Sequence, residues 1–290
     1  MPTPFFSVIV NCHNGEQFLA NALDSIINQS FTNWEVVFWD NCSTDNSASI
    51  FSEYQDSRFN YYVSSKKTPL GEARNLAISK AKGVWITFLD CDDIWLSFKL
   101  ERQYEIIKKS SPNVALVYGD IEIFRDLSTN PSHAWGELLL RKKDRSLLNL
   151  PEGNIFPLLA KENFIGIVAA AIKRDAIDLV GGINETLKQA EDYDLLLKVA
   201  YRFDAAACLA VIAKYRVHKN NLSAKQYDLN YTESIDILKT FLPDRVALQG
   251  IKSHYNAMAI NFIRNGKVLR GIMTFIQHGS FYLLFNKLKK

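Results

Sequence analysis

The sequence predicts an α/β fold with a mostly parallel sheet flanked by helices. A short apolar run, a polar turn and a segment with helical spacing follow one another three times before a fourth apolar run at residues 84–89. Apolar runs without polar alternation are typical of strands buried on both faces. Strands that alternate with helices indicate parallel strands joined by right-handed crossovers.

Each expected element rests on a local pattern. β-branched and aromatic runs predict strands at residues 5–10, 34–39, 59–63, 84–89, 114–118, 164–172 and 205–215. Apolar residues at helical spacing predict helices at residues 16–28, 71–81, 98–110, 174–180 and 191–203, with one more capped by Thr44 or Asp45. Residues 127–153 are polar and carry no clear pattern.

The length of 290 residues and a hydrophobic share of 48% allow one large domain or two small ones. We expect one α/β domain over residues 1–225 and a helical extension over residues 226–290, with a linker near Pro243. From residue 246 onward the sequence holds seven Lys and Arg residues and no Asp or Glu. This basic tail either lies on an anionic membrane surface or packs as a helical cap on the rest of the chain or on a dimer partner.

Composition also narrows the class of partner and the compartment. A net charge of +3 is too small to predict nucleic-acid binding. The N-terminus lacks the basic segment of a signal peptide, and no apolar stretch reaches the roughly 18 residues of a membrane span. Four widely spaced cysteines favour reduced thiols. We therefore expect a cytoplasmic protein, peripheral on the inner face of the membrane if the tail binds lipid.

Three carboxylates follow the fourth predicted strand, in the run Phe88-Leu89-Asp90-Cys91-Asp92-Asp93. Unpaired charge is costly inside a buried strand, so these residues are expected where the strand leaves the sheet. In open α/β sheets that edge binds ligands, and clustered carboxylates suit hard divalent metals. For this motif alone, a solvated turn or a helix N-cap is the competing interpretation.

Other polar turns follow Val10 and Trp39, the last residues of two more predicted strands. Because parallel strands end at the same edge of a sheet, these turns and the carboxylates after Leu89 are expected to converge on one cleft. That convergence favours a functional site over an isolated solvated turn.

The set of motifs resembles family 2 glycosyltransferases of the GT-A fold. The resemblance spans residues 5 to about 223, and its motifs occur in the family's order. They are Ser7-Val8-Ile9-Val10-Asn11-Cys12-His13-Asn14, Asp40-Asn41-Cys42-Ser43-Thr44-Asp45, Ala73-Arg74-Asn75, Phe88-Leu89-Asp90-Cys91-Asp92-Asp93, Glu191-Asp192 and Tyr215-Arg216-Val217-His218.

The resemblance implies metal-dependent transfer of a hexose or N-acetylhexosamine from a UDP-sugar to a saccharide or lipid-linked saccharide acceptor. The setting it implies is the assembly of bacterial surface polysaccharide or lipopolysaccharide. Asp192 matches the family's catalytic base, which takes the acceptor's proton, and Glu191 would help to position the acceptor. One base and no enzyme nucleophile implies inversion at the anomeric carbon. Taken alone, this acidic pair is also ordinary at a helix N-terminus.

Asp90-Cys91-Asp92 matches the family's Asp-x-Asp motif. By resemblance, Asp92 would hold Mn²⁺ or Mg²⁺, and Asp90 would meet the ribose hydroxyls or a metal-bound water. His218 is a further candidate ligand of the metal or the phosphate. Its alternative is a surface histidine that follows a strand.

His13, Asp40 and Arg74 match positions near the nucleotide, where an arginine offers a planar cationic donor to phosphate. The chain departs from the pattern at Asn41, where the family often has a second Asp, and at His13, where Tyr is common. Turn and surface-helix roles remain open for His13 and Arg74. Trp95 is either an aromatic wall for a sugar or part of the core.

Two further classes of protein stay open. A non-catalytic nucleotide-sugar-binding or scaffold protein would be expected to lack Asp92 or Asp192, and both are present. A sugar-1-phosphate nucleotidyltransferase would share a nucleotide cleft and a metal. Its expected glycine-rich phosphate loop is missing near the N-terminus.

Overall fold

The computed structural model describes residues 3–125, 150–219, 221 and 227–278. The chain divides into two compact units, residues 1–155 with 165–224 and residues 156–164 with 225–290. The boundary expected between residues 225 and 226 lies outside the described residues. The short segment 156–164 belongs to the unit of C-terminal helices, although nothing in its own pattern indicates this.

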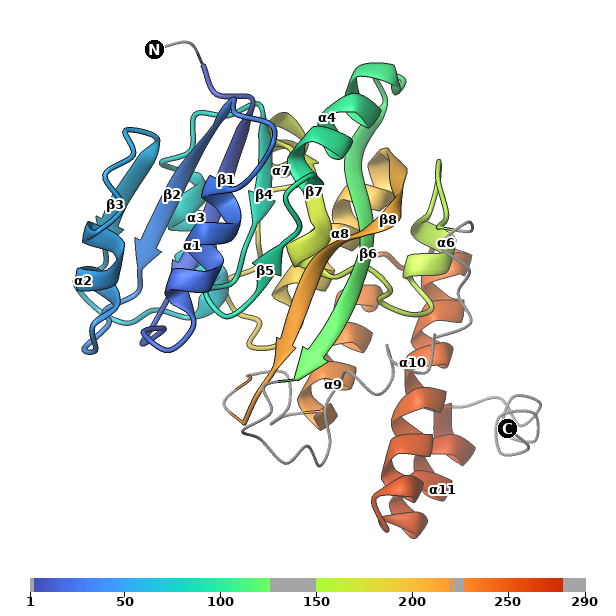
Figure 1. The fold of residues 1–290 in the computed structure, drawn as a ribbon. Helices are drawn as coiled ribbons and strands as arrows, with labels where there is room; N and C mark the ends of the chain where they lie inside the picture. Colours follow the sequence, from blue (N-terminus) through green and yellow to red (C-terminus); the bar gives the residue numbers. More distant parts are fainter. Residues whose placement is uncertain (1–2, 126–149, 220, 222–226, 279–290) are drawn as a thin grey trace. The chain divides into compact units, whose positions relative to one another are not determined.

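The first unit contains one eight-stranded sheet with the order β3-β2-β1-β4-β7-β6-β8-β5 (Figure 1). Strands β7 and β5 run against their neighbours, and the other pairings are parallel, so the predicted mostly parallel α/β sheet is confirmed. The strands are β1 (Phe6–Cys12), β2 (Trp34–Asp40), β3 (Phe59–Val63), β4 (Trp85–Phe88), β5 (Ile94–Trp95), β6 (Val114–Arg125), β7 (Ala170–Lys173) and β8 (Asp204–Val217).

Helices cover both faces of this sheet. The helices of the first unit are α1 (Leu19–Ile27), α2 (Ser47–Ser52), α3 (Leu70–Ile78), α4 (Lys99–Lys109), α7 (Arg174–Leu179) and α8 (Glu191–Arg202). Figure 1 shows α1, α2 and α4 on one face and α3, α7 and α8 on the other. Connections of this kind leave the carboxyl ends of the parallel strands uncovered by helices, and ligands bind there in open α/β sheets.

The central strands are buried on both faces, as their unbroken apolar sequences predict. Every residue of β1, β2 and β4 is buried. On one face, Val8 and Val36 belong to the same apolar cluster as Leu23 and Ile26 of α1. This close packing gives the sheet edge a rigid base.

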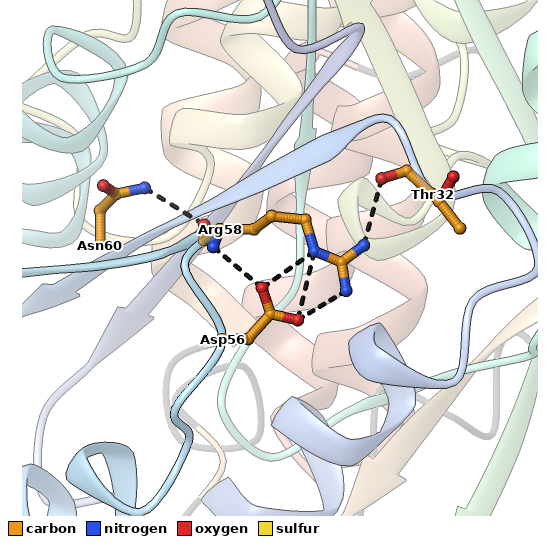
Figure 2. Close-up of polar contacts among 4 residues, drawn as sticks. All are labelled: Thr32, Asp56, Arg58 and Asn60. Carbon is orange, nitrogen blue, oxygen red and sulfur yellow. Dashed lines mark hydrogen bonds and ion pairs between the residues drawn. The ribbon is translucent and has the colours of Figure 1, made fainter. Parts of the chain in front are cut away.

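A network of polar contacts fixes the start of the outer strand β3 (Figure 2). The Arg58 guanidinium donates to both carboxylate oxygens of Asp56 and, at 3.1 Å, to the carbonyl of Thr32. Its central carbon lies 3.5 Å from the centre of the Trp34 ring. The side-chain amide of Asn60 donates to the Arg58 carbonyl. The loop before β3 is thereby tied to the loop before β2.

Two of the predicted strands differ from their expected course by more than a few residues. The strand expected to end at Tyr118 continues as β6 to Arg125, with irregular pairing to β8 around Gly119. A Cβ atom at Gly119 would lie 2.7 Å from the Ile212 side chain, so glycine permits the close approach of β6 and β8. The strand expected over 164–172 is instead a 3₁₀ turn at Ile167–Ala169 followed by β7. Residues 127–149 lie outside the described part.

The second unit consists of helices α6 (Phe156–Leu159), α9 (Tyr227–Lys239), α10 (Arg245–Arg264) and α11 (Val268–His278). Helix α11 approaches α10 closely at Gly271, where a Cβ atom would lie 2.6 Å from the carbonyl oxygen of Ala259. Phe275 is buried, whereas Leu269 and Ile276 are exposed. Among the described residues, no helix combines the length and apolarity needed to cross a membrane.

Candidate active site

The polar turns after β1, β2 and β4 lie together because these strands are neighbours and run in parallel. The Asn41 backbone N–H donates to the Cys12 carbonyl at 2.7 Å, and the Asn14 N–H donates to the Ser43 hydroxyl at 3.0 Å. The turn after β4 begins directly at Asp90, one residue beyond the buried Leu89. The expected convergence of the three turns is present.

Arg74 of α3 joins two parts of this edge. Its side chain is 3% exposed and donates to Asp90 Oδ1 at 2.9 Å and to Glu191 Oε1 at 2.8 Å. Burial works against its positive charge, but the charges of Asp90, Glu191 and Asp192 outweigh this and raise the pKa of Arg74. The guanidinium therefore links the Asp-x-Asp turn to the first turn of α8.

Asp192, the second residue of α8, is partly exposed. Burial, and next the charge of Glu191, raise the pKa of Asp192 to about 7, against the opposing effect of Arg74. A carboxylate in this range accepts and releases protons near neutral pH, which is the property of a general base.

Asp92 and His218 form the second cluster of the edge. His218 Nε2 lies 2.9 Å from Asp92 Oδ2, although the two residues are 126 positions apart in the chain. Within the described ranges, no group of three or more His, Cys, Asp or Glu side chains is arranged for a metal. One carboxylate and one imidazole nonetheless fit Mn²⁺ or Mg²⁺ when substrate phosphates supply further oxygens, as is usual for Mg²⁺ in nucleotide enzymes.

Asp40 and His13 lie at the ends of the two neighbouring strands. Asp40 is 2% exposed and accepts hydrogen bonds from the Ser43 N–H at 2.7 Å and from the Tyr61 hydroxyl at 2.6 Å. His13 Nδ1 lies 3.0 Å from the Asn41 carbonyl, so this nitrogen is the donor. The sequence interpretation did not include Tyr61, because its pattern is only that of an outer-strand residue.

Asp93 and Arg216 are further residues of the edge. The sequence interpretation included Asp93 only as one of three clustered carboxylates and Arg216 only as part of the last motif. Asp93 is 1% exposed, and burial together with the charges of Asp92 and Asp90 raises the pKa of Asp93 well above its usual range. Arg216 is 8% exposed and donates from Nε to the Asp92 carbonyl at 2.8 Å. Their signal in the sequence was only their position inside the two motifs.

Trp95 lies in the core, which corresponds to the second of its two interpretations. It is 2% exposed, and its indole N–H donates to the Val168 carbonyl at 2.9 Å. The reason is that Trp95 belongs to β5, whose pairing with Ala213 of β8 carries the chain back into the sheet. We therefore correct the sugar-wall expectation and leave Trp95 out of the site.

Comparison with known proteins identifies the family to which the chain belongs. Residues 7–176, more than half of the chain, match the model of a family described as glycosyl transferase family 2. The chain belongs to glycosyl transferase family 2. This assignment confirms the resemblance and makes the chain a glycosyltransferase.

The chain is similar to the UDP-Glc:alpha-D-GlcNAc-diphosphoundecaprenol beta-1,3-glucosyltransferase WfgD of Escherichia coli. It is 27% identical over 259 residues, which cover 86% of this chain and 94% of WfgD.

Two solved structures share the fold. S. aureus TarS, residues 1–349, in complex with UDP-GlcNAc superposes with a TM-score of 0.69 and 19% identity, covering 94% of this chain and 79% of the TarS chain. The mannosyltransferase PcManGT from Pyrobaculum calidifontis, in complex with GDP-Man and Mn²⁺, gives a TM-score of 0.65 and 17% identity, covering 99% and 80%. At these identities the likeness shows the fold alone, and the predicted GT-A-like architecture is confirmed.

The Arg74 contacts generate a stability prediction. Arg74→Met removes the charge that Glu191, 6% exposed, faces in the folded protein, and it is expected to lower the free energy of unfolding by about 3 kcal/mol. Adding Glu191→Gln should restore part of this loss. Urea unfolding of both variants measures the effect.

Arg102→Met, which removes an exposed i,i+3 pair, is the control and should change stability by no more than about 0.5 kcal/mol. A loss below about 1 kcal/mol for Arg74→Met would contradict the ion-pair account.

Proposed function

We propose that this glycosyltransferase moves a hexose or N-acetylhexosamine from a UDP-sugar to a saccharide or lipid-linked saccharide acceptor, with inversion at the anomeric carbon. The observation that carries the proposal is the Arg74 link between Asp90 on the expected donor side and the Glu191-Asp192 pair on the expected acceptor side. One guanidinium thus holds a residue expected to meet the donor and a residue expected to meet the acceptor, and a reaction between two bound substrates requires both to be held in place.

On the donor side, Asp92 and His218 would hold Mn²⁺ or Mg²⁺. A divalent ion there would offset the charge that develops on the leaving diphosphate. Asp40 and His13 lie at the ends of the adjacent strands, where a nucleoside would reach them, and Asp90 would meet the ribose. The hydrogen bonds from Ser43 and Tyr61 hold the Asp40 carboxylate in one orientation.

On the acceptor side, Asp192 would take the proton of the attacking hydroxyl. Its pKa of about 7 lets the ionised form be well populated at neutral pH while the group remains basic enough to accept a proton. Glu191 is held by Arg74 and would orient the acceptor beside this base. A single displacement assisted by one base inverts the anomeric centre.

The identity of the substrates is supported by the relatives. The name of WfgD specifies UDP-Glc and an undecaprenol-diphosphate-linked GlcNAc, and TarS was solved with UDP-GlcNAc. These names favour a UDP-linked donor and an acceptor of bacterial surface glycan assembly for this chain. PcManGT was solved with GDP-Man, so GDP is the comparison nucleotide in any test.

We further propose that helix α11 brings the protein to the inner face of an anionic membrane, where a lipid-linked acceptor would lie. Leu269 is 81% exposed and Ile276 is 57% exposed, and they share one side of the helix with Ile272 and Met273, which are also exposed. The helical unit, residues 156–164 with 225–290, contains 11 Lys and Arg against 5 Asp and Glu. An exposed apolar stripe on a basic unit has the chemistry of a peripheral membrane surface.

The donor site is tested by calorimetric titration of UDP, GDP and dTDP with and without Mn²⁺. UDP is expected to bind more tightly with Mn²⁺, and Asp92→Ala should remove this dependence because it removes a metal ligand. Asp45→Asn is the control and should keep the Mn²⁺ dependence. Asp45 is a carboxylate at the same edge that accepts hydrogen bonds from backbone N–H groups. Tighter binding of GDP or dTDP would replace the UDP assignment. No nucleotide binding under any condition would favour the scaffold alternative.

The role of Asp192 predicts a pH dependence. Because the ionised form is the base, kcat/KM should fall about tenfold for each pH unit below about 7 and level off above it. Glu191→Gln should move the midpoint to lower pH, because the Glu191 charge raises the pKa of Asp192. Asp192→Asn should lower kcat by about 10²–10⁴-fold. A wild-type profile without an acidic limb would speak against this base.

The membrane surface is tested by co-sedimentation of the full chain with phosphatidylglycerol vesicles. Replacing Leu269 and Ile276 together by Glu should weaken binding by about a hundredfold or more, since each buried apolar side chain contributes about 1.5–3 kcal/mol. Leu179→Glu, at a 59%-exposed position in α7, is the control and should bind as the wild type does. Equal binding of the Leu269/Ile276 variant and the Leu179→Glu control would contradict the assignment of α11 as the membrane surface. Failure of the wild type to bind would contradict it as well.

A further inference from the structure

We propose that Asp93 and Arg216 form a brace, a pair of hydrogen bonds that sets the separation of Asp92 and His218. Asp93 and Arg216 are then positioning residues for the metal, and Asp92 and His218 are its ligands. The inference rests on the proposed function, because it concerns the metal that Asp92 and His218 would hold. It assigns a role to the third carboxylate of the Asp90-Cys91-Asp92-Asp93 run.

The brace consists of two hydrogen bonds that run between the same two segments. The Arg216 backbone N–H donates to Asp93 Oδ1 at 2.8 Å, and the Arg216 side chain donates from Nε to the Asp92 carbonyl at 2.8 Å. The two bonds thus tie the segment of Asp92 and Asp93 to Arg216, which lies two positions before His218. Sheet pairing continues beyond the brace, where Ile94 of β5 pairs with Lys214 of β8.

The Arg216 side chain is itself held in place. Its guanidinium carbon lies 4.3 Å from the centre of the Phe18 ring and 4.6 Å from the centre of the Phe124 ring. The Phe18 ring also lies 5.0 Å from the His218 ring. A planar guanidinium stacks on aromatic rings in a way that a lysine ammonium does not, so this position is specific for arginine.

The backbone on the His218 side is fixed as well. Asn221 Oδ1 accepts a hydrogen bond from the His218 N–H at 2.5 Å, and Asn221 Nδ2 donates to the Arg216 carbonyl at 3.0 Å. Arg216 therefore connects Asp93 on one side with the turn that carries His218 on the other.

The separation that results suits a metal. Asp92 Oδ2 and His218 Nε2 are 2.9 Å apart. Both atoms would therefore be close enough to bind one divalent ion, which would take the place of their direct contact. The brace thus holds the pair near the spacing that coordination requires, which lowers the cost of binding the ion.

Asp93 is poorly placed to bind the metal directly. It is 1% exposed, and Oδ1 is occupied by the Arg216 N–H. Oδ2 is enclosed and has no hydrogen-bond partner among the described residues. A hydrated divalent ion has no open approach to either oxygen, whereas Asp92 is 26% exposed.

The test compares Mn²⁺ affinity in the presence of UDP, measured by electron paramagnetic resonance. Asp93→Ala is expected to weaken Mn²⁺ binding by about 10–100-fold, as is usual when a supporting residue of a metal site is removed. Asp93→Asn should stay within about threefold of the wild type, because its carbonyl oxygen can accept the same N–H. Arg216→Lys keeps the backbone bond, loses the stacked donor and should fall between them.

Glu35→Ala is the matched control. Glu35 is a buried carboxylate at the other end of the sheet, where it accepts hydrogen bonds from the Ser7 hydroxyl and the Lys82 N–H. Its loss should lower stability without changing Mn²⁺ affinity. Wild-type affinity in Asp93→Ala would overturn the brace, and so would an equal loss in Asp93→Asn, because Asp93 would then act through its charge.

Hydrogen exchange without metal or nucleotide gives a second, independent result. The amide protons of residues 214–219 and 221 are expected to exchange faster in Asp93→Ala and to keep wild-type protection in Asp93→Asn. Unchanged exchange in Asp93→Ala would overturn the brace. If the wild type binds no Mn²⁺ with UDP, the proposed function fails, and the exchange result still decides whether the brace holds His218 in place.

Discussion

The guanidinium of Arg74 is the group on which the arrangement of the active site depends. A buried positive charge needs negative partners close by, and Arg74 has two, Asp90 after β4 and Glu191 at the start of α8. Because Glu191 begins α8, the same ion pair fixes the direction of that helix's first turn and with it Asp192. Burial is the main cause of the raised pKa of Asp192, and the charges of Glu191 and Arg74 then act on it in opposite directions.

Much of the fold could be predicted because the central strands have unbroken apolar sequences, which indicate burial on both faces. Strand β3 occupies the predicted residues, and β1, β2 and β4 are buried on both faces, as runs without polar alternation indicate. The continuation of β6 past Gly119 could not be predicted, since glycine inside a strand pattern usually suggests a break or a bulge. The approach of Ile212 and of the Ala210 carbonyl from β8 explains the glycine.

The candidate site shows the same division. Asp90, Asp92 and Asp40 could be placed at one edge because parallel strands end together, a consequence of topology that a local pattern reveals. The contacts of Tyr61, Asp93 and Arg216 are made across long sequence separations and are specific to the folded chain. Trp95 shows the converse, because a motif neighbour can turn into the core when the next residues pair with a distant strand. Motif spacing therefore identifies reacting residues more easily than it identifies the residues that hold them in position.

The two outer strands of the sheet have a consequence for self-association. A free strand edge is a template on which a second molecule can add a strand. In the described part of the chain, one edge is the two-residue strand β5, and the other is the five-residue strand β3. Lys66 and Lys67 follow the end of β3, and lysine charges beside an outer strand disfavour such pairing. These two outer strands themselves thus offer a second copy of the protein little length on which to add a strand.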